Sequence, residues 1–199
     1  MLLVALTGGL ATGKSRVGKV FVELGCHLIQ ADELGHIALA SQGEAYAPTV
    51  AEFGSGILSA DGSIDRKALA AIVFNHPEKL QKLNAIVHPA VERLRLKQIE
   101  TIQLADPRAI ILVEAAIHIE TGGYKRYEKL ILAVCGREEQ IRRAMKRDHS
   151  SREEVLSRID RQMSIDEKRK FADYVIDTSG DEANTLTQTV EVYNQIKKL

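Results

Sequence analysis

Hydrophobic and polar residues follow one another along this chain in blocks that predict strands and helices in turn. Short, continuous apolar runs predict buried strands, and apolar residues at helical spacing predict the helices between them. The predicted strands cover 2–6, 27–31, 109–113, 130–134 and 174–176. The predicted helices begin at Lys14 and then cover about 33–40, 65–74, 78–87, 89–104, 138–147, 152–163 and 182–197, with a mixture of short helix and loop over 42–65. This alternation is typical of an α/β fold built on a parallel sheet.

The segment between the first strand and the first helix is Gly8-Gly9-Leu10-Ala11-Thr12-Gly13-Lys14-Ser15. It fits the phosphate-binding loop pattern of a glycine, four residues and Gly-Lys-Ser. Its glycines let backbone N–H groups point at phosphate oxygens, and the helix N-terminus that follows favours an anion. We predict that Lys14 reaches the β- and γ-phosphates of a nucleotide and that Ser15 ligates Mg²⁺. The alternative is a glycine turn before a helix with a surface lysine, which the flanking strand and helix disfavour.

Composition limits the other classes of function. Lys and Arg number 27 and Asp and Glu number 27, so the formal net charge is zero and gives no support for general nucleic-acid or membrane-surface binding. The apolar run at the N-terminus is too short for a signal peptide. The apolar run at 109–113 ends at the charged Glu114, so no bilayer span is expected. Cys26 and Cys135 match no metal or redox pattern and are expected to be buried thiols. We expect a cytoplasmic protein.

Two acidic residues stand at the ends of predicted strands. Asp32 follows the second strand and Glu114 ends the third. Because ligands bind at the carboxyl ends of parallel strands, we expect Asp32 to face the same crevice as the phosphate loop. There it either accepts a proton from an attacking hydroxyl or only caps the following helix. Glu114 is a candidate for the Mg²⁺ site, directly or through water, or is a solvent-facing carboxylate.

A basic cluster follows the fourth strand. Arg143 and Arg147 are four residues apart and share a helix face, and Arg158 and Arg161 are three apart. The cluster also contains Arg137, Arg142, Lys146 and Arg152. Two arginine-bearing helices predict a lid that neutralises charge on a transferred phosphoryl group. Acidic neighbours leave open the alternative of an ion-paired surface.

More specific motifs occur further along the chain. They are Leu83-Asn84-Ala85-Ile86-Val87-His88-Pro89, then Gln140 with Arg143 and Arg147-Asp148, then Arg158-Ile159 with Gln162-Met163, and finally Glu167-Lys168-Arg169 with 172–177. Together with the phosphate loop and Ala31-Asp32 they follow the order of the dephospho-CoA kinases, which the chain resembles over nearly its whole length. Without the resemblance, the position of His88 before Pro89 would favour a role in shaping a turn over a contact with substrate.

The resemblance implies ATP-dependent phosphorylation of the ribose 3′-hydroxyl of dephospho-CoA, the last step of coenzyme A synthesis, with Mg²⁺. It also implies one P-loop NTPase domain over 1–199, similar to nucleoside monophosphate kinases. Such a domain has a five-stranded parallel core (about 1–40, 106–136 and 172–199), a helical acceptor-side region (about 41–105) and a lid (about 137–171). Nucleic acid and membrane are not expected partners. The sequence sets no oligomeric state, and we favour a monomer.

The resemblance also assigns site residues by position. The expected catalytic residues are Asp32 as general base, Lys14, Arg143 and Arg147. The expected nucleotide-binding residues are Gly8, Gly9, Ala11, Thr12, Gly13, Lys14, Ser15 and Arg16. The expected acceptor-binding residues are Asp32, His88, Arg158 and Gln162, and the expected metal ligands are Ser15 and Glu114.

Several positions depart from the family pattern. Ala11 replaces a usual glycine, Arg16 a threonine, Gln30 an aspartate and Thr178 an asparagine near the adenine side, and 116–120 replaces a common Pro-Leu-Leu-Phe-Glu run. These changes leave the phosphate-loop groups in place but bear on acceptor and adenine contacts. Another small-molecule or nucleotide kinase of the same fold is the nearest alternative, and a nucleotide-dependent switch without an acceptor is a more distant one.

Overall fold

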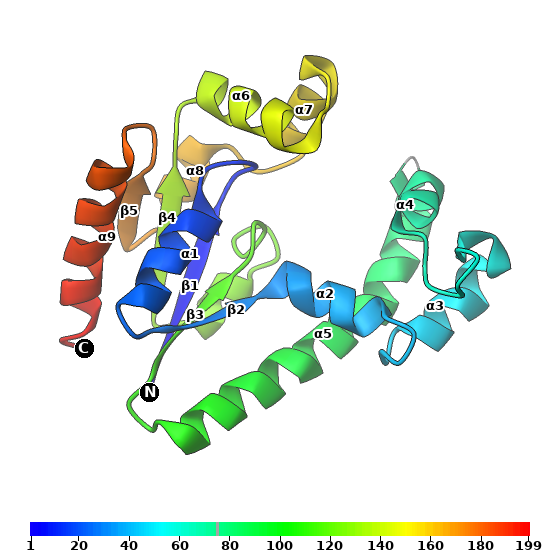
Figure 1. Ribbon diagram of the computed structural model, residues 1–199, viewed down its shortest axis with the longest axis horizontal. Coiled ribbons are helices and arrows are strands. Elements are labelled where there is room, and N and C mark those ends of the chain that lie inside the picture. Colours follow the sequence, from blue (N-terminus) through cyan, green and yellow to red (C-terminus); the bar gives the residue numbers. More distant parts are fainter. Residues whose placement is uncertain (75) are drawn as a thin grey trace. The chain divides into compact units, whose positions relative to one another are not determined.

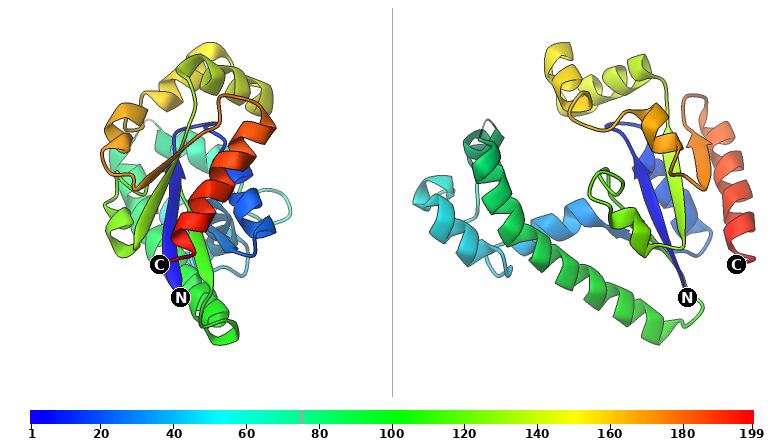
Figure 2. Two further views of the ribbon diagram at one scale, coloured as in Figure 1. Left: turned by 90° about the vertical axis from the view of Figure 1, so that its left-hand side faces the viewer. Right: turned by 180° about the vertical axis from the view of Figure 1, so that it is seen from behind.

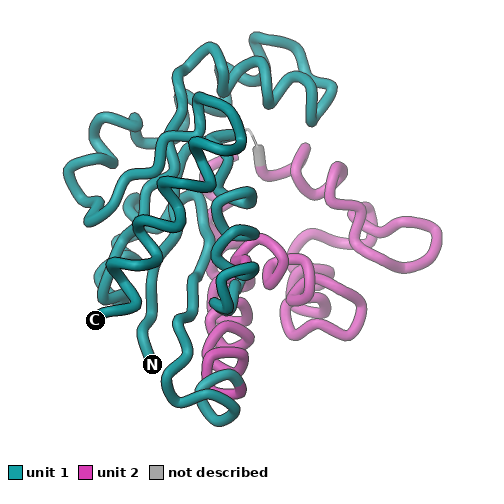
Figure 3. Tube along the Cα trace, turned by 60° about the vertical axis from the view of Figure 1, so that its left-hand side comes forward, with its two compact units in different colours: residues 1–29, 102–199 teal, residues 30–101 magenta. Residues whose placement is uncertain are grey.

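The computed structural model describes residues 1–74 and 76–199, and the chain divides into two compact units (Figure 3). The larger unit comprises residues 1–29 and 102–199, and the smaller one comprises residues 30–101. The core was expected to extend to about residue 40, whereas the helix at 31–39 belongs to the smaller unit. The reason is packing, because Ala38 at the end of this helix is buried in a cluster with Ala45 and Ala90.

A five-stranded parallel sheet forms the centre of the larger unit, as predicted, in the order β2-β3-β1-β4-β5. The strands are β1 (Leu2–Gly8), β2 (His27–Gln30), β3 (Ile110–Glu114), β4 (Lys129–Val134) and β5 (Tyr174–Asp177). In the parallel register, Leu6 of β1 lies beside Glu114 of β3 and beside Ile131 of β4. This register places the last residue of β3 next to the strand that leads into the phosphate loop.

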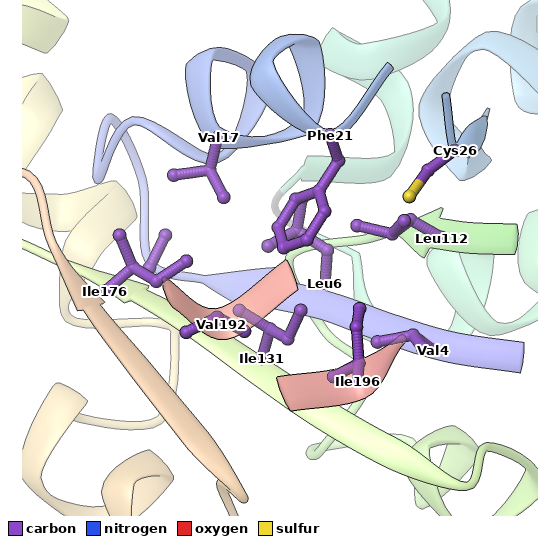
Figure 4. Close-up of a cluster of buried hydrophobic side chains, with 11 residues drawn as sticks. Val4, Leu6, Val17, Phe21, Cys26, Leu112, Ile131, Ile176, Val192 and Ile196 are labelled. Carbon is purple, nitrogen blue, oxygen red and sulfur yellow. The ribbon is translucent and has the colours of Figure 1, made fainter. Parts of the chain in front are cut away.

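Helices α1 (Lys14–Glu23) and α9 (Glu182–Ile196) cover one face of the sheet side by side (Figures 1 and 2). Between them and the strands lies the main core, which Figure 4 shows around Phe21. It contains Val4, Leu6, Val17, Phe21, Cys26, Leu112, Ile131, Ala133, Ile176, Val192 and Ile196. The continuous apolar runs of the central strands supply this core, which explains why these strands were predicted close to their observed bounds. Both cysteines are free and buried, as expected.

The smaller unit is built from helices around its own apolar cluster. They are α2 (Ala31–Leu39), α3 (Tyr46–Phe53), the 3₁₀ turn η1 (Ser55–Ile57), α4 (Arg66–Phe74) and most of α5 (Pro77–Ala105). Ile57, Ile64, Leu69 and Val73 are its buried centre. The short helix within loops expected over 42–65 is therefore confirmed as α3.

The prediction of two helices at 78–87 and 89–104 is wrong, because α5 is a single helix of 29 residues that contains Pro89. A proline inside a helix removes one backbone donor and crowds the preceding turn. Tertiary packing overrides that cost here. Ile86 and Val87 before Pro89 and Val91 and Leu94 after it all pack on the same buried alanines, so both halves of the helix are held on one surface.

The segment expected as the lid contains three helices, α6 (Arg137–Asp148), α7 (Arg152–Ile159) and α8 (Ile165–Arg169). The predicted helix over 152–163 is too long, and α8 was not predicted. Capping boxes explain both starts, because Ser151 pairs with Glu154 at α7 and Ser164 pairs with Glu167 at α8. The 3₁₀ turn η2 (Gly123–Arg126) precedes β4.

Candidate active site

The phosphate loop connects β1 to α1, and its conformation depends on glycine at two places. A Cβ on Gly8 would lie 2.5 Å from the carbonyl oxygen of Ala133, a contact that backbone atoms do not tolerate. Gly13 has a φ of +84°, and a Cβ there would lie 2.9 Å from Oγ1 of Thr178. Ala11 has a φ of +55°, a left-handed conformation that costs a non-glycine residue roughly 1–2 kcal/mol.

The cationic end of Lys14 lies on the loop itself. Its Nζ donates to the carbonyl oxygens of Gly8 and Gly9 at 3.2 and 2.9 Å. Helix α1 begins at Lys14, and among the described residues no side chain caps its first turn and no acidic residue lies within that turn. The first turn of the helix therefore offers N–H groups and a positive dipole end that favour an anion.

The two expected metal ligands come together. The Ser15 hydroxyl donates to Oε1 of Glu114 at 3.1 Å. Ser15 lies in the first turn of α1 and Glu114 ends β3, so the sheet register brings these distant residues to the same edge. Glu114 is 8% exposed, which rules out the alternative of a solvent-facing carboxylate.

The segment expected as the lid binds the tip of the loop at Leu10. Gln162 accepts a hydrogen bond from the Leu10 amide, and Gln140 donates to the Leu10 carbonyl oxygen, both at 2.8 Å. Leu10 and Ala11 also pack against the buried lid residues, which are Ile141, Ala144 and Val155. The structure thus places Gln162, which was expected on the acceptor, on the backbone of the loop.

Arg143 and Arg147 line a cavity of about 320 Å³ together with the loop residues Ala11, Thr12, Gly13, Lys14 and Ser15. The Arg143 guanidinium donates to Glu139, to Oγ1 of Thr178 and to the Thr178 carbonyl oxygen. The cavity is therefore lined by three cationic side chains beside the free end of a helix, an arrangement suited to a polyphosphate.

Asp148 links two of the predicted lid arginines. Its carboxylate accepts from Arg147 at 2.7 Å and from Arg158 at 2.6 Å. These bonds, Arg147 first, lower the pKa of Asp148 from 3.8 to about 2. Glu139 is held in the same way by Arg142 and Arg143, which lower its pKa to about 2. Part of the basic cluster is therefore ion-paired, while two of its arginines still line the phosphate cavity.

Other predicted site residues lie elsewhere. Arg16 forms an ion pair with Glu182 of α9 at 3.1 Å. Asp32 and His88 are exposed residues of the smaller unit, on α2 and α5 respectively. Asp32 does not cap α2 as suggested, since α2 begins at Ala31 and its N-cap position is Gln30. Asp32 instead lies in the first turn, where the helix dipole favours a carboxylate.

Sequence reasoning assigned no role to three residues that shape this site. Gln140 and Thr178 contact the loop directly, and Lys168 is fully buried and bonds the Ala116 carbonyl oxygen beyond Glu114. Thr178 directly follows β5, so the rule that ligands bind at the carboxyl ends of parallel strands would have selected it. Gln140 and Lys168 lie within helices and belong to the motifs that carry the resemblance, but no comparable structural rule assigns them a contact.

A parallel sheet of this order, with a phosphate loop after β1 and an arginine-bearing lid after β4, defines a P-loop kinase. The family model of dephospho-CoA kinase matches residues 2–184 of the chain. The chain therefore belongs to the dephospho-CoA kinase family.

Individual relatives agree with this assignment. The dephospho-CoA kinase of Aquifex aeolicus is 42% identical over 200 residues, which cover 100% of this chain and 99% of that protein. The solved structure of TT1252 from Thermus thermophilus superposes with a TM-score of 0.87 at 31% identity, covering 98% of this chain and 97% of the other. The dephospho-CoA kinase of Campylobacter jejuni gives a TM-score of 0.72 at 30% identity over the same shares. As a kinase of this family, the protein uses ATP. Over residues 1–74 and 76–199, no helix is long and apolar enough to cross a membrane.

Proposed function

We propose that this protein transfers the γ-phosphoryl group of ATP to the ribose 3′-hydroxyl of dephospho-CoA, which yields coenzyme A and ADP. The observation that carries the proposal is the cavity formed by the phosphate loop, Arg143 and Arg147 in a chain of the dephospho-CoA kinase family. In the reaction the acceptor oxygen attacks the γ-phosphorus, and the bond from that phosphorus to the bridging oxygen of ADP breaks.

The loop and the lid would bind and screen the triphosphate. Lys14, which donates to loop carbonyl oxygens and lines the same cavity, would bind phosphate oxygens there. Arg147 and Arg158 are joined through Asp148, so they would move as one unit. Their charge would neutralise the transferred group, and the lid would exclude water as a competing nucleophile.

Asp32 is the proposed general base, which orients the 3′-hydroxyl and takes its proton. It follows the carboxyl end of β2 by two residues, the end of a parallel strand at which ligands bind. His88 is proposed to contact the acceptor, since its exposed side chain leaves it available to a ligand. For Arg158 and Gln162, the structure supports roles in the lid more directly than contacts with the acceptor.

The residues around the loop fit a magnesium ion. Ser15 and Glu114 offer a hydroxyl and a carboxylate 3.1 Å apart, and oxygen ligands are those that Mg²⁺ prefers. The described residues contain no group of three or more His, Cys, Asp or Glu side chains that could hold a metal. Few protein ligands are usual for Mg²⁺ bound with a nucleotide. When bound, the ion would neutralise charge on the phosphates. We further propose that the protein is cytoplasmic, which suits its two free buried thiols, and that it is a monomer.

The direct test is ADP release with ATP and Mg²⁺, with and without dephospho-CoA, together with identification of coenzyme A as the product. We expect release to depend on the acceptor and to match the coenzyme A formed. A panel of nucleoside monophosphates and shikimate separates this activity from other kinases of the fold. Intact ATP binding without any stimulation by dephospho-CoA would refute the proposed substrate.

Two variants with matched controls test the assigned roles. Lys14→Met should lower turnover by at least about a hundredfold, whereas Lys19→Met, an exposed lysine of the same helix, should leave turnover unchanged. Asp32→Asn should lower turnover by roughly 10²-fold or more with little change in ATP affinity, and Glu33→Gln is its exposed neighbour control. Wild-type turnover in Asp32→Asn would remove Asp32 from the mechanism.

A further inference from the structure

Thr178 occupies an unusual position at the end of the sheet. It directly follows β5, and its side chain is completely buried. Its hydroxyl donates to the carbonyl oxygen of Thr12 in the phosphate loop at 2.8 Å and to that of Val134 at the end of β4 at 3.2 Å. Its backbone N–H also donates to Val134 at 2.8 Å. One buried threonine thus joins β4 and β5 to the loop.

The same residue holds the lid arginine that lines the phosphate cavity. Arg143 donates from Nη1 to Oγ1 of Thr178 at 3.0 Å and from Nη2 to the Thr178 carbonyl oxygen at 2.6 Å. Nε donates to Glu139 at 2.7 Å. A guanidinium is a rigid plane, so bonds from all three of its nitrogens fix both its position and its orientation.

The loop fits closely against this anchor. A Cβ on Gly13 would lie 2.9 Å from Oγ1 and 3.2 Å from Cγ2 of Thr178, so the loop backbone packs directly on this side chain. The Thr178 hydroxyl therefore lies between two parts of the cavity, the Thr12–Gly13 backbone and the Arg143 guanidinium. Its hydrogen points to carbonyl oxygens, and one of its two lone pairs accepts the hydrogen bond from Arg143.

We infer that Thr178 is a positioning residue that fixes the Arg143 guanidinium relative to the phosphate loop and thereby sets the affinity for the donor nucleotide. The inference rests on the proposed function only in taking this cavity as the nucleotide site. Thr178 is assigned no contact with the reacting atoms, so its loss should weaken nucleotide binding more than it slows phosphoryl transfer.

Three variants test the inference. Thr178→Val removes the hydroxyl and keeps the shape, Thr178→Ser keeps the hydroxyl, and Thr189→Val is the matched control. Thr189 is also completely buried, but its hydroxyl donates along α9, to the Thr185 carbonyl oxygen. Thr178→Ala is a second hydroxyl-free variant, should valine prevent folding.

ATP binding is measured by calorimetry without acceptor, and KM and kcat are then measured with dephospho-CoA. We expect Thr178→Val to raise the dissociation constant and KM for ATP about tenfold, the effect of one lost hydrogen bond to a charged group. We expect kcat and the KM for dephospho-CoA to stay within about twofold, and Thr178→Ser and Thr189→Val to bind ATP like the wild type. Wild-type ATP affinity in both hydroxyl-free variants, or a loss confined to kcat, would overturn the inference.

A double-mutant cycle with Arg143→Met shows whether Thr178 acts through the arginine. If it does, Thr178→Val should change ATP affinity little once the guanidinium is gone. Full additivity would overturn the inference. Because binding is measured without acceptor, a wild-type protein that binds ATP but makes no coenzyme A would refute the proposed function alone.

Discussion

The ion pair between Lys168 and Glu120 allows a prediction in which the effect of one mutation on stability depends on whether the other is already present. The Lys168 ammonium is completely buried and lies 2.8 Å from Oε1 of Glu120, whose side chain is 23% exposed. Lys168 also donates to the Ala116 carbonyl oxygen at 2.7 Å, and Glu120 accepts from the Met163 amide at 3.2 Å. The two charges thus join α8 to the segment that follows Glu114, but only one of them can reach water.

That asymmetry sets the magnitudes. Glu120→Gln leaves a fully buried ammonium without its counter-charge, and we expect it to lower the free energy of unfolding by about 3 kcal/mol or more. Lys168→Met leaves a carboxylate that still reaches water and still accepts one amide, so about 1–2 kcal/mol is expected. The double variant buries no charge, and Lys168→Met should therefore restore stability to a protein that already carries Glu120→Gln.

Urea unfolding followed by circular dichroism measures all three variants at neutral pH. At roughly 2–4 °C per kcal/mol for a chain of this size, Glu120→Gln should also lower the melting temperature by about 6–12 °C. Glu138→Gln, which breaks an exposed ion pair with Arg152, is the control and should change stability very little. If Lys168→Met lowers the stability of the Glu120→Gln protein further, the buried charge is not the cause and the reasoning fails.

Three other predictions follow from single groups. Ser15→Ala should raise the Mg²⁺ concentration for half-maximal activity by roughly tenfold without changing the melting temperature, and an unchanged Mg²⁺ dependence would remove Ser15 from the metal site. The pKa of Asp148 is lowered from 3.8 to about 2, so its contribution to stability is complete above about pH 4 and is lost as the pH falls toward 2. Asp148→Asn should flatten that part of the stability curve in urea titrations at stepped pH, and an unaltered slope would contradict this. Pro89→Ala should raise the free energy of unfolding by about 1–3 kcal/mol, because alanine supplies the helix with a donor for the Ala85 carbonyl oxygen, and no gain in urea stability would show that the helix already compensates.

The central strands β1, β3 and β4 were predictable because their burial leaves an almost unbroken apolar signature. Helix boundaries were less predictable where tertiary contacts override local preference. Pro89 marks a helix start by its local chemistry, yet apolar residues on both sides of it pack on one surface and keep α5 continuous. Conversely, Ser164 and Glu167 form a capping box at the start of α8, a local pattern that is visible in the sequence.

The same division holds for the candidate site. The pairing of Ser15 with Glu114 follows from strand order and the rule that polar residues gather at the carboxyl ends of strands. The contacts that hold the loop do not follow from any such rule, because they end on peptide groups. At Leu10, Gln140 and Gln162 bond the carbonyl oxygen and the amide, groups that almost any residue would present. Only the side chains of Gln140, on α6, and Gln162, between α7 and α8, carry information about this contact, and their place in the motifs does not say that they bond the loop backbone.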